Sequence, residues 1–265
     1  MEQNVTLRPA ATVLTVRDGA DGVEVLMLRR NLNSDFVGGA YVFPGGGVDL
    51  GDAGPAAARV AFGVDDREAS RRLGLEAGGL AYFVACLREL FEEAGLLLAC
   101  NDHGETFRFA SDEVVARMAE NRRGVNAGTL GFVEMMERES TMLDLRGLAY
   151  FAHWVTPVGL HRRYDTRFFV ALAPNDQTAA HDAGETVADH WVRPVDALDA
   201  HRRGEWELLP PTISALRSIA ELASSEGVLD HARSLSSIPR IEPRIVTRDG
   251  AFDILLPGDE GYDDA

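Results

Sequence analysis

Short apolar runs separated by turn-forming residues open the chain. Residues 11–16 and 23–28 are rich in aliphatic and β-branched side chains, and an Asp- and Gly-rich segment lies between them. This pattern predicts a β-hairpin. Residues 40–43 form another strand candidate, which runs into Pro44 and the glycines 45–47, a sharp loop that needs glycine conformations.

Helical spacing is clearest over residues 82–94, where Phe83, Leu87, Leu90 and Phe91 share one side. Gly95 is typical of a helix end. Beyond it, the pattern predicts a buried strand at 96–99 and further strands at 148–155, 167–173 and 190–192. Further helices are predicted at 55–62, 67–73, 111–120, 129–137, 194–203 and 211–223. The tail after about 236 is expected to wrap the surface or pair as an edge strand, and the mixture favours an α/β sandwich.

Composition limits the class of protein. With 265 residues, 46% of them hydrophobic, the chain can bury a large core, as one domain with insertions. No apolar run is long enough to span a bilayer and residues 1–9 lack an apolar signal core, so neither a membrane nor secretion is expected. The two cysteines, Cys86 and Cys100, fit a reducing cytoplasm and are expected to be ordinary buried thiols.

The charge balance excludes several chemistries. The net charge is −16 and all 26 basic residues are arginines, so a P-loop lysine, a Schiff-base lysine and a Ser/Lys dyad are impossible. The acidic surplus argues against nucleic-acid and membrane binding. An anionic substrate would therefore need a metal ion or a few well-placed arginines.

Three acids stand together on the helix predicted at 82–94. Glu89, Glu92 and Glu93 occupy positions i, i+3 and i+4, so their carboxylates lie within one turn. Such oxygen ligands suit Mg²⁺ or Mn²⁺. A solvated acidic helix face is the alternative, and the neighbouring Arg88, Gly95 and the upstream glycine loop favour the site.

These residues resemble the signature of the Nudix hydrolase family. That signature is Gly, five residues, an acid, seven residues, then Arg-Glu-apolar-x-Glu-Glu-x-Gly-apolar. The second half matches from Arg88 to Leu96, and Gly46 with Asp52 matches the first half. Two departures are an Asp where the family has Glu, and 35 residues between Asp52 and Arg88 instead of seven.

The 28-residue insertion resembles a Nudix subgroup that includes the peroxisomal coenzyme A diphosphatase of mammals. Similar segments recur between about residues 10 and 222. They are 36–46, 154–157, 163–169, 185–191 and 210–212. The resemblance implies one domain over 1–265, an α/β/α sandwich with a mixed sheet, a helical insertion at 53–80 and extra helices in a C-terminal extension from about 223. We expect the insertion to rejoin the sheet before the motif helix and to leave Asp52 away from the metals.

The resemblance also implies roles for the motif residues. Glu89 and Glu93 would be metal ligands, Glu92 a ligand or the base, and Arg88 would orient Glu89 through a salt bridge. Close approach at the glycine loop would bring the backbone carbonyl of Gly46 near the metal.

Further site residues are candidates with ordinary alternatives. Glu185 is the candidate for an additional catalytic acid, and is otherwise a common loop glutamate. The substrate-binding candidates are Arg29, Arg30, Phe36, Arg163, Tyr164 and Arg167, with Arg162 beside them. Guanidinium groups match phosphates and aromatic rings stack on bases, but surface pairing and core packing are the alternatives.

The leading interpretation is hydrolysis of coenzyme A or acyl-coenzyme A, a small-molecule nucleoside diphosphate derivative. ADP-ribose or a dinucleotide is the alternative substrate, a non-catalytic nucleotide sensor is the second class, and an acidic interaction module is the third. The intact glutamates argue against the sensor. The leaving group, the number of metals, the identity of the base and a homodimer stay open, because loops outside the motif build the pocket.

Overall fold

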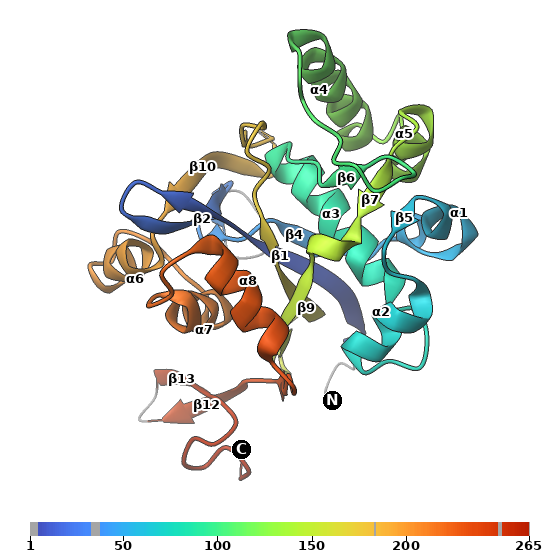
Figure 1. Cartoon of the computed structure of the whole chain (residues 1–265). Helices are drawn as coiled ribbons and strands as arrows, with labels where there is room; N and C mark the ends of the chain where they lie inside the picture. Colours follow the sequence, from blue (N-terminus) through green and yellow to red (C-terminus); the bar gives the residue numbers. More distant parts are fainter. Residues whose placement is uncertain (1–4, 33–37, 183, 249–250, 265) are drawn as a thin grey trace.

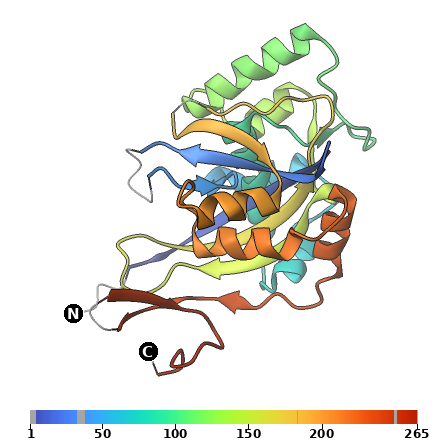
Figure 2. The ribbon, with the colours of Figure 1, turned by 90° about the vertical axis from the view of Figure 1, so that its left-hand side faces the viewer.

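The computed structural model describes residues 5–32, 38–182, 184–248 and 251–264. Within these residues, an eight-stranded mixed sheet forms the centre (Figures 1 and 2). The strands follow the order β10–β2–β1–β9–β8–β11, with β3 paired to β2 and β4 paired to β1. The strands are β1 (Leu7–Gly19), β2 (Gly22–Arg30), β3 (Tyr41–Val42), β4 (Gly45–Gly47), β8 (Ala149–Val155), β9 (Arg163–Leu172), β10 (Thr186–Val192) and β11 (Arg240–Ile241).

The predicted N-terminal hairpin is confirmed, and β1 has two partners on one side. Its second half pairs antiparallel with β2, from Val16 opposite Val25 to Gly19 opposite Gly22. Its first half pairs with the glycine strand β4, with Ala11 opposite Gly46. The long strand β1 therefore fixes the glycine loop against the sheet.

Helices cover both faces of this sheet (Figure 1). One face carries α3 (Leu80–Ala94), whose apolar side packs on β1 and β9, with the rings of Phe83 and Phe169 4.8 Å apart. The other face carries α6 (Pro194–Arg202), α7 (Pro210–Ile219) and α8 (Ser225–Ser234). The predicted α/β/α sandwich is confirmed. No helix among the described residues has the length and apolar character to cross a membrane.

The insertion is helical, as predicted. It follows the 3-10 turn η1 (Leu50–Asp52) and contains α1 (Gly54–Arg59), β5 (Ala61–Phe62) and α2 (Asp66–Leu73). The expectation that it rejoins the main sheet is wrong, because β5 pairs instead with β7 (Met142–Asp144) in a separate sheet that β6 (Ala99–Cys100) completes. The segment between β6 and β7 forms α4 (Asp112–Asn126) and α5 (Phe132–Arg138), and η2 (Leu145–Gly147) follows β7.

The strand predicted at 96–99 is shorter and shifted, because only Ala99 and Cys100 pair in β6. The backbone of Leu97 bonds to a side chain instead: its N–H donates to Gln177 Oε1 at 2.8 Å, and its carbonyl accepts from Gln177 Nε2 at 2.9 Å. The side-chain amide of Gln177 thus makes the two hydrogen bonds that a neighbouring strand would otherwise make with Leu97. Cys86 and Cys100 are both buried and free, as expected.

The C-terminal tail does pair as an edge. β11 runs parallel to β8, and β12 (Arg244–Arg248) with β13 (Ala251–Leu255) forms a separate hairpin (Figure 2).

A matched pair of substitutions tests the packing of α3. Leu87→Ala, at a position that is 1% exposed, should lower the free energy of unfolding by about 2–5 kcal/mol. Leu50→Ala, at a position that is 99% exposed, should change it by less than about 0.5 kcal/mol. Urea unfolding followed by circular dichroism measures both, and equal midpoints would contradict this account of the core.

Candidate active site

Helix α3 presents the three acids of the motif at its C-terminal end. Gly95 ends the helix in the left-handed conformation, with φ at 70°, and its N–H donates to the Phe91 carbonyl. The apolar side turns into the core, so Glu89, Glu92 and Glu93 lie along its border, where Glu93 is only 6% exposed. Local helical periodicity therefore places the three glutamates within one turn of α3.

The buried guanidinium of Arg88 holds these acids in place. Its NH1 donates to Glu89 Oε1 at 2.8 Å and to Glu92 Oε2 at 3.1 Å. Its NH2 donates to the Gly47 carbonyl at 2.7 Å. The structure thus shows the ion pair between Arg88 and Glu89 that the resemblance implied.

Asp52 occupies the other side of the same guanidinium. Its two carboxylate oxygens accept from Nε and NH2 of Arg88 at 2.8 and 2.9 Å, and Asp52 is 1% exposed. The backbone N–H of Asp49 also donates to Asp52, at 2.7 Å. Arg88 therefore bridges Asp52 and the glutamates in space, although 35 residues of chain separate the two halves of the motif.

The glycine strand β4 is the floor of the site. The Gly45 N–H donates to Glu93 Oε2 at 2.8 Å. A Cβ on Gly46 would lie 2.5 Å from Glu89 Oε1, so only glycine lets that carboxylate rest against the backbone. The main chain and the helix acids thus meet without side chains between them.

Burial and crowding raise the pKa of each glutamate. Burial raises the pKa of Glu89 to about 7, with Arg88 opposing the shift and Glu92 adding to it. Burial, and then the charge of Glu89, raise the pKa of Glu93 well above its usual range. Burial also raises the pKa of Glu92 against the opposing charge of Arg88. A positive ion would relieve this crowding.

The donor chemistry fits a hard divalent cation, since carboxylates and a backbone carbonyl are the oxygen ligands that Mg²⁺ and Mn²⁺ prefer. Among the described residues, no three acidic, histidine or cysteine side chains already converge as metal ligands do. The reason is visible in the contacts: Glu89 and Glu92 turn toward Arg88, and Glu93 accepts from Gly45. Binding a metal there would require these carboxylates to turn.

Arg30 and Glu185 lie beside the glutamates. The Asn31 N–H donates to the Glu185 carbonyl at 2.8 Å where β2 and β10 meet. Alternation along β2 places Arg30 on the α3 face with Leu28. The charge of Arg30 lowers the pKa of Glu93 and that of Glu185 raises it, although burial has the largest effect. Arg29 points to the opposite face, as alternation along a strand requires, and lies 5.8 Å from the ring of Tyr41.

The candidates on β9 are engaged elsewhere. Arg167 is buried, pairs with Asp165 and His153, and lies 5.6 Å from the ring of Tyr82. Tyr82 precedes Glu89 by seven residues, about 10 Å along the helix. The structure does not bring Arg167 to the glutamates.

The two neighbouring candidates on β9 also have other partners. Arg163 donates to the Thr156 carbonyl and pairs with Glu242, while the N–H of Tyr164 donates to the Thr156 hydroxyl. Phe36 lies outside the described residues.

Arg122 is a neighbour of the site that sequence reasoning missed. From α4, its Nε donates to the Glu92 carbonyl at 2.9 Å. Because Arg122 lies 30 residues after Glu92, no spacing within the motif could reveal it.

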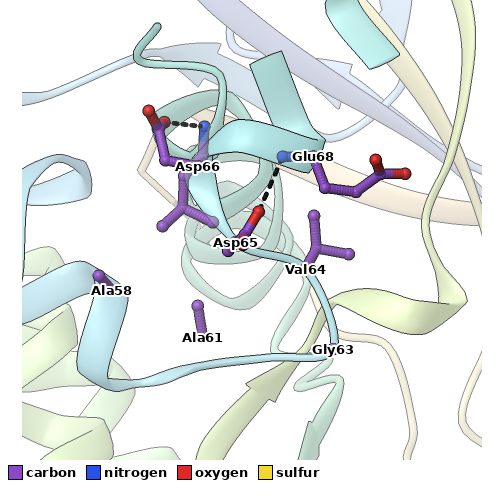
Figure 3. A pocket seen from close by; sticks show the side chains of 8 residues that line it. Ala58, Ala61, Gly63, Val64, Asp65, Asp66 and Glu68 are labelled. Atoms are coloured by element: carbon purple, nitrogen blue, oxygen red, sulfur yellow. Dashed lines mark hydrogen bonds between the residues drawn. The ribbon is translucent and has the colours of Figure 1, made fainter. Parts of the chain in front are cut away.

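A cavity of about 430 Å³ lies within the insertion, away from these residues (Figure 3). Asp65, Asp66 and Glu68 line it. Asp65 caps α2 by accepting from the Glu68 N–H, and Asp66 accepts from the Gly78 and Leu80 N–H groups. These carboxylates therefore serve the local fold.

Comparisons with known proteins show related sequences and a related fold. The family model of the NUDT19 Nudix domain matches residues 6–219. The chain is 29% identical to the acyl-coenzyme A diphosphatase NUDT19 of Gallus gallus, over 90% of this chain and 72% of that protein. It is 28% identical to the Homo sapiens protein of the same name, over 92% and 73%. Among solved structures, a NUDIX hydrolase from Alicyclobacillus acidocaldarius superposes with a TM-score of 0.67 at 28% identity, covering 86% of this chain and 97% of that one.

The raised pKa of Glu89 predicts a pH-dependent stability in metal-free buffer. Between the ordinary value of 4.5 and about 7, the folded state keeps a proton that the unfolded state has lost, so stability falls as pH rises through this range. Glu89→Gln should therefore be more stable than the wild type at pH 8, by up to about 3 kcal/mol, and the gain should vanish near pH 4.

Urea unfolding at both pH values, with chelator present, measures this difference. Glu76→Gln is the matched control, because Glu76 is exposed on a loop. Parallel pH profiles for the wild type and Glu89→Gln would contradict the account.

Proposed function

The chain belongs to the NUDT19 Nudix domain family and is a Nudix hydrolase, and from this premise we propose that it cleaves the diphosphate of coenzyme A or acyl-coenzyme A with Mg²⁺ or Mn²⁺. Water adds across the P–O–P linkage, so that one phosphorus gains the hydroxyl and the other phosphate leaves. The products are a phosphopantetheine species and adenosine 3′,5′-bisphosphate. The single observation that carries the proposal is the cluster of Arg88 with Glu89, Glu92 and the buried Glu93, in a chain whose curated relatives bear this activity in their names.

The residues that would hold the metal are Glu89, Glu92, Glu93 and the carbonyl of Gly46. When bound, a divalent cation polarises phosphoryl oxygens and lowers the pKa of a coordinated water. Arg88 keeps Glu89 and Glu92 aligned at 2.8 and 3.1 Å. Arg88 therefore acts through its neighbours.

Two carboxylates are candidates for accepting the proton of the attacking water. Glu92 is the more exposed of the two glutamates paired with Arg88, and Glu185 lies on the loop before β10, where its charge acts on Glu93. Glu92 is already paired with Arg88 at 3.1 Å. We propose Glu185 as the proton acceptor and Glu92 as a ligand.

Substrate charge is the second element of the proposal. Coenzyme A carries a 3′-phosphate besides its diphosphate, and in a chain of net charge −16 without lysine its donor must be arginine, histidine or a backbone N–H. Arg163 pairs with Glu242 and Arg167 pairs with Asp165, away from the motif glutamates. Arg30 lies on the side of the glutamates, which favours it as the phosphate contact.

The glycine pair of β4 tests the metal site without removing a carboxylate. Gly46→Ala would push Glu89 aside and should lower kcat by about 100-fold, the effect of misplacing a catalytic group by about 1 Å. Gly47→Ala meets nothing within 4 Å and should retain near-normal turnover.

Glu89→Gln and Glu93→Gln should each lower kcat by about two to four orders of magnitude. Near-normal rates in both glutamine variants would refute the assignment.

A substrate panel tests the specificity. With Mg²⁺ or Mn²⁺, the enzyme should cleave coenzyme A faster than dephospho-coenzyme A, by about tenfold or more, the effect of one charged hydrogen bond. Arg30→Gln should erase this preference. Arg29→Gln, which changes the preceding residue and lies on the opposite face of the sheet, should keep it. Chromatography of the adenosine products provides the rates. Faster cleavage of ADP-ribose or NADH than of any coenzyme A ester would refute the substrate class and leave the family unaffected.

A further inference from the structure

Groups from outside the helix hold the last turn of α3. The carbonyl of Ala94 accepts from the Ala180 N–H at 2.9 Å, and the carbonyl of Glu92 accepts from two side chains of α4. In Figure 1, α4 lies beyond this end of α3. Helix ends leave carbonyls without partners inside the helix, so these contacts decide how firmly the final turn is held. That turn carries Glu92 and Glu93.

Arg122 makes one of these contacts. Its Nε donates to the Glu92 carbonyl at 2.9 Å, and Asn126 Nδ2 donates to the same oxygen at 3.1 Å. A Cβ on Gly95 would lie 3.0 Å from Arg122 NH1, so the guanidinium lies close against the helix end. Its NH2 is buried and has no hydrogen-bond partner among the described residues. The guanidinium of Arg122 is therefore held at the helix end, and its NH2 group makes no hydrogen bond among the described residues.

The surroundings of Arg122 are acidic. Burial lowers the pKa of Arg122, and the charges of Asp182, Glu93 and Asp189 oppose that shift. A cation is also favoured at the C-terminal end of a helix dipole. Glu93 thus interacts with the charge of Arg122 and also accepts a hydrogen bond from the Gly45 N–H.

Resting on the proposed function, we propose that Arg122 is a positioning residue, which holds the last turn of α3 so that Glu92 and Glu93 present their carboxylates to the metal. Arg122 touches neither the metal nor the substrate in this role. It acts through the Glu92 carbonyl and through its charge beside Glu93.

A purely structural cap would give a different result. Loss of such a cap lowers the melting temperature and leaves the metal affinity of the folded enzyme unchanged. Loss of a positioning residue weakens metal binding and lowers kcat more than it changes KM, typically by about 10–100-fold when a group behind a metal ligand is removed.

The experiment compares Arg122→Met with Arg123→Met. Both remove one positive charge from α4 and keep a long side chain, but Arg123 is exposed and pairs with Glu120 at the surface. Mn²⁺ binding to the metal-free proteins is followed by electron paramagnetic resonance, alongside the melting temperature, kcat and KM. Arg122→Met should raise the Kd for Mn²⁺ and lower kcat by about tenfold or more, with KM nearly unchanged, and Arg123→Met should match the wild type.

Two further variants keep the proposal testable if Arg122→Met does not fold. Arg122→Lys keeps the charge and loses the planar fork, and Asn126→Ala removes the second donor to Glu92. Each should raise the Kd for Mn²⁺ by about threefold or more, and Arg122→Lys should retain more activity than Arg122→Met. Wild-type Mn²⁺ affinity in the folded variants would overturn the proposal. A wild type without Mn²⁺ binding would overturn the proposed function as well, and the two failures are distinct.

Discussion

A buried guanidinium must find acceptors for its donors, and in this protein that requirement falls on Arg88. Its partners come from η1, from β4 and from its own helix: Asp52, Gly47, Glu89 and Glu92. An unpaired buried charge is strongly destabilising, so the native state must bring these elements together. The long insertion is tolerated because closing a longer loop costs only slightly more entropy, whereas Arg88 requires Asp52 at the end of that loop.

The same cluster holds negative charge that the fold does not fully neutralise. Burial raises the pKa of Glu89, Glu92 and Glu93 together, and Arg88 offsets only part of the cost. Strongly shifted acids in one place are typical of functional sites, where stability is given up for chemistry. A bound divalent cation would offset the unfavourable free energy of this buried negative charge. Binding of the proposed cofactor should therefore stabilise the folded state.

The two faces of the sheet have different roles: one carries the candidate site and the other is covered by a second apolar core. The α3 face carries Arg88, the glutamates and the end of β2 at Arg30. The other face is covered by α6, α7 and α8 and forms a second apolar core, while β11 extends the sheet beyond β8. Helices α6, α7 and α8 thus cover the face opposite α3, and only α8 and β11 belong to the C-terminal extension.

Local features of the chain were predictable from sequence. The apolar spacing and Gly95 predicted α3 and its three acids on one face, because helical periodicity and the left-handed glycine end are properties of neighbouring residues. Relations between elements were not. The pairing of Asp52 with Arg88, the opposite faces of Arg29 and Arg30, the distance of Arg163 and Arg167 from the glutamates, and the contact from Arg122 depend on strand register and helix crossing. These are decided by packing between segments far apart in the chain, which spacing within one segment does not encode.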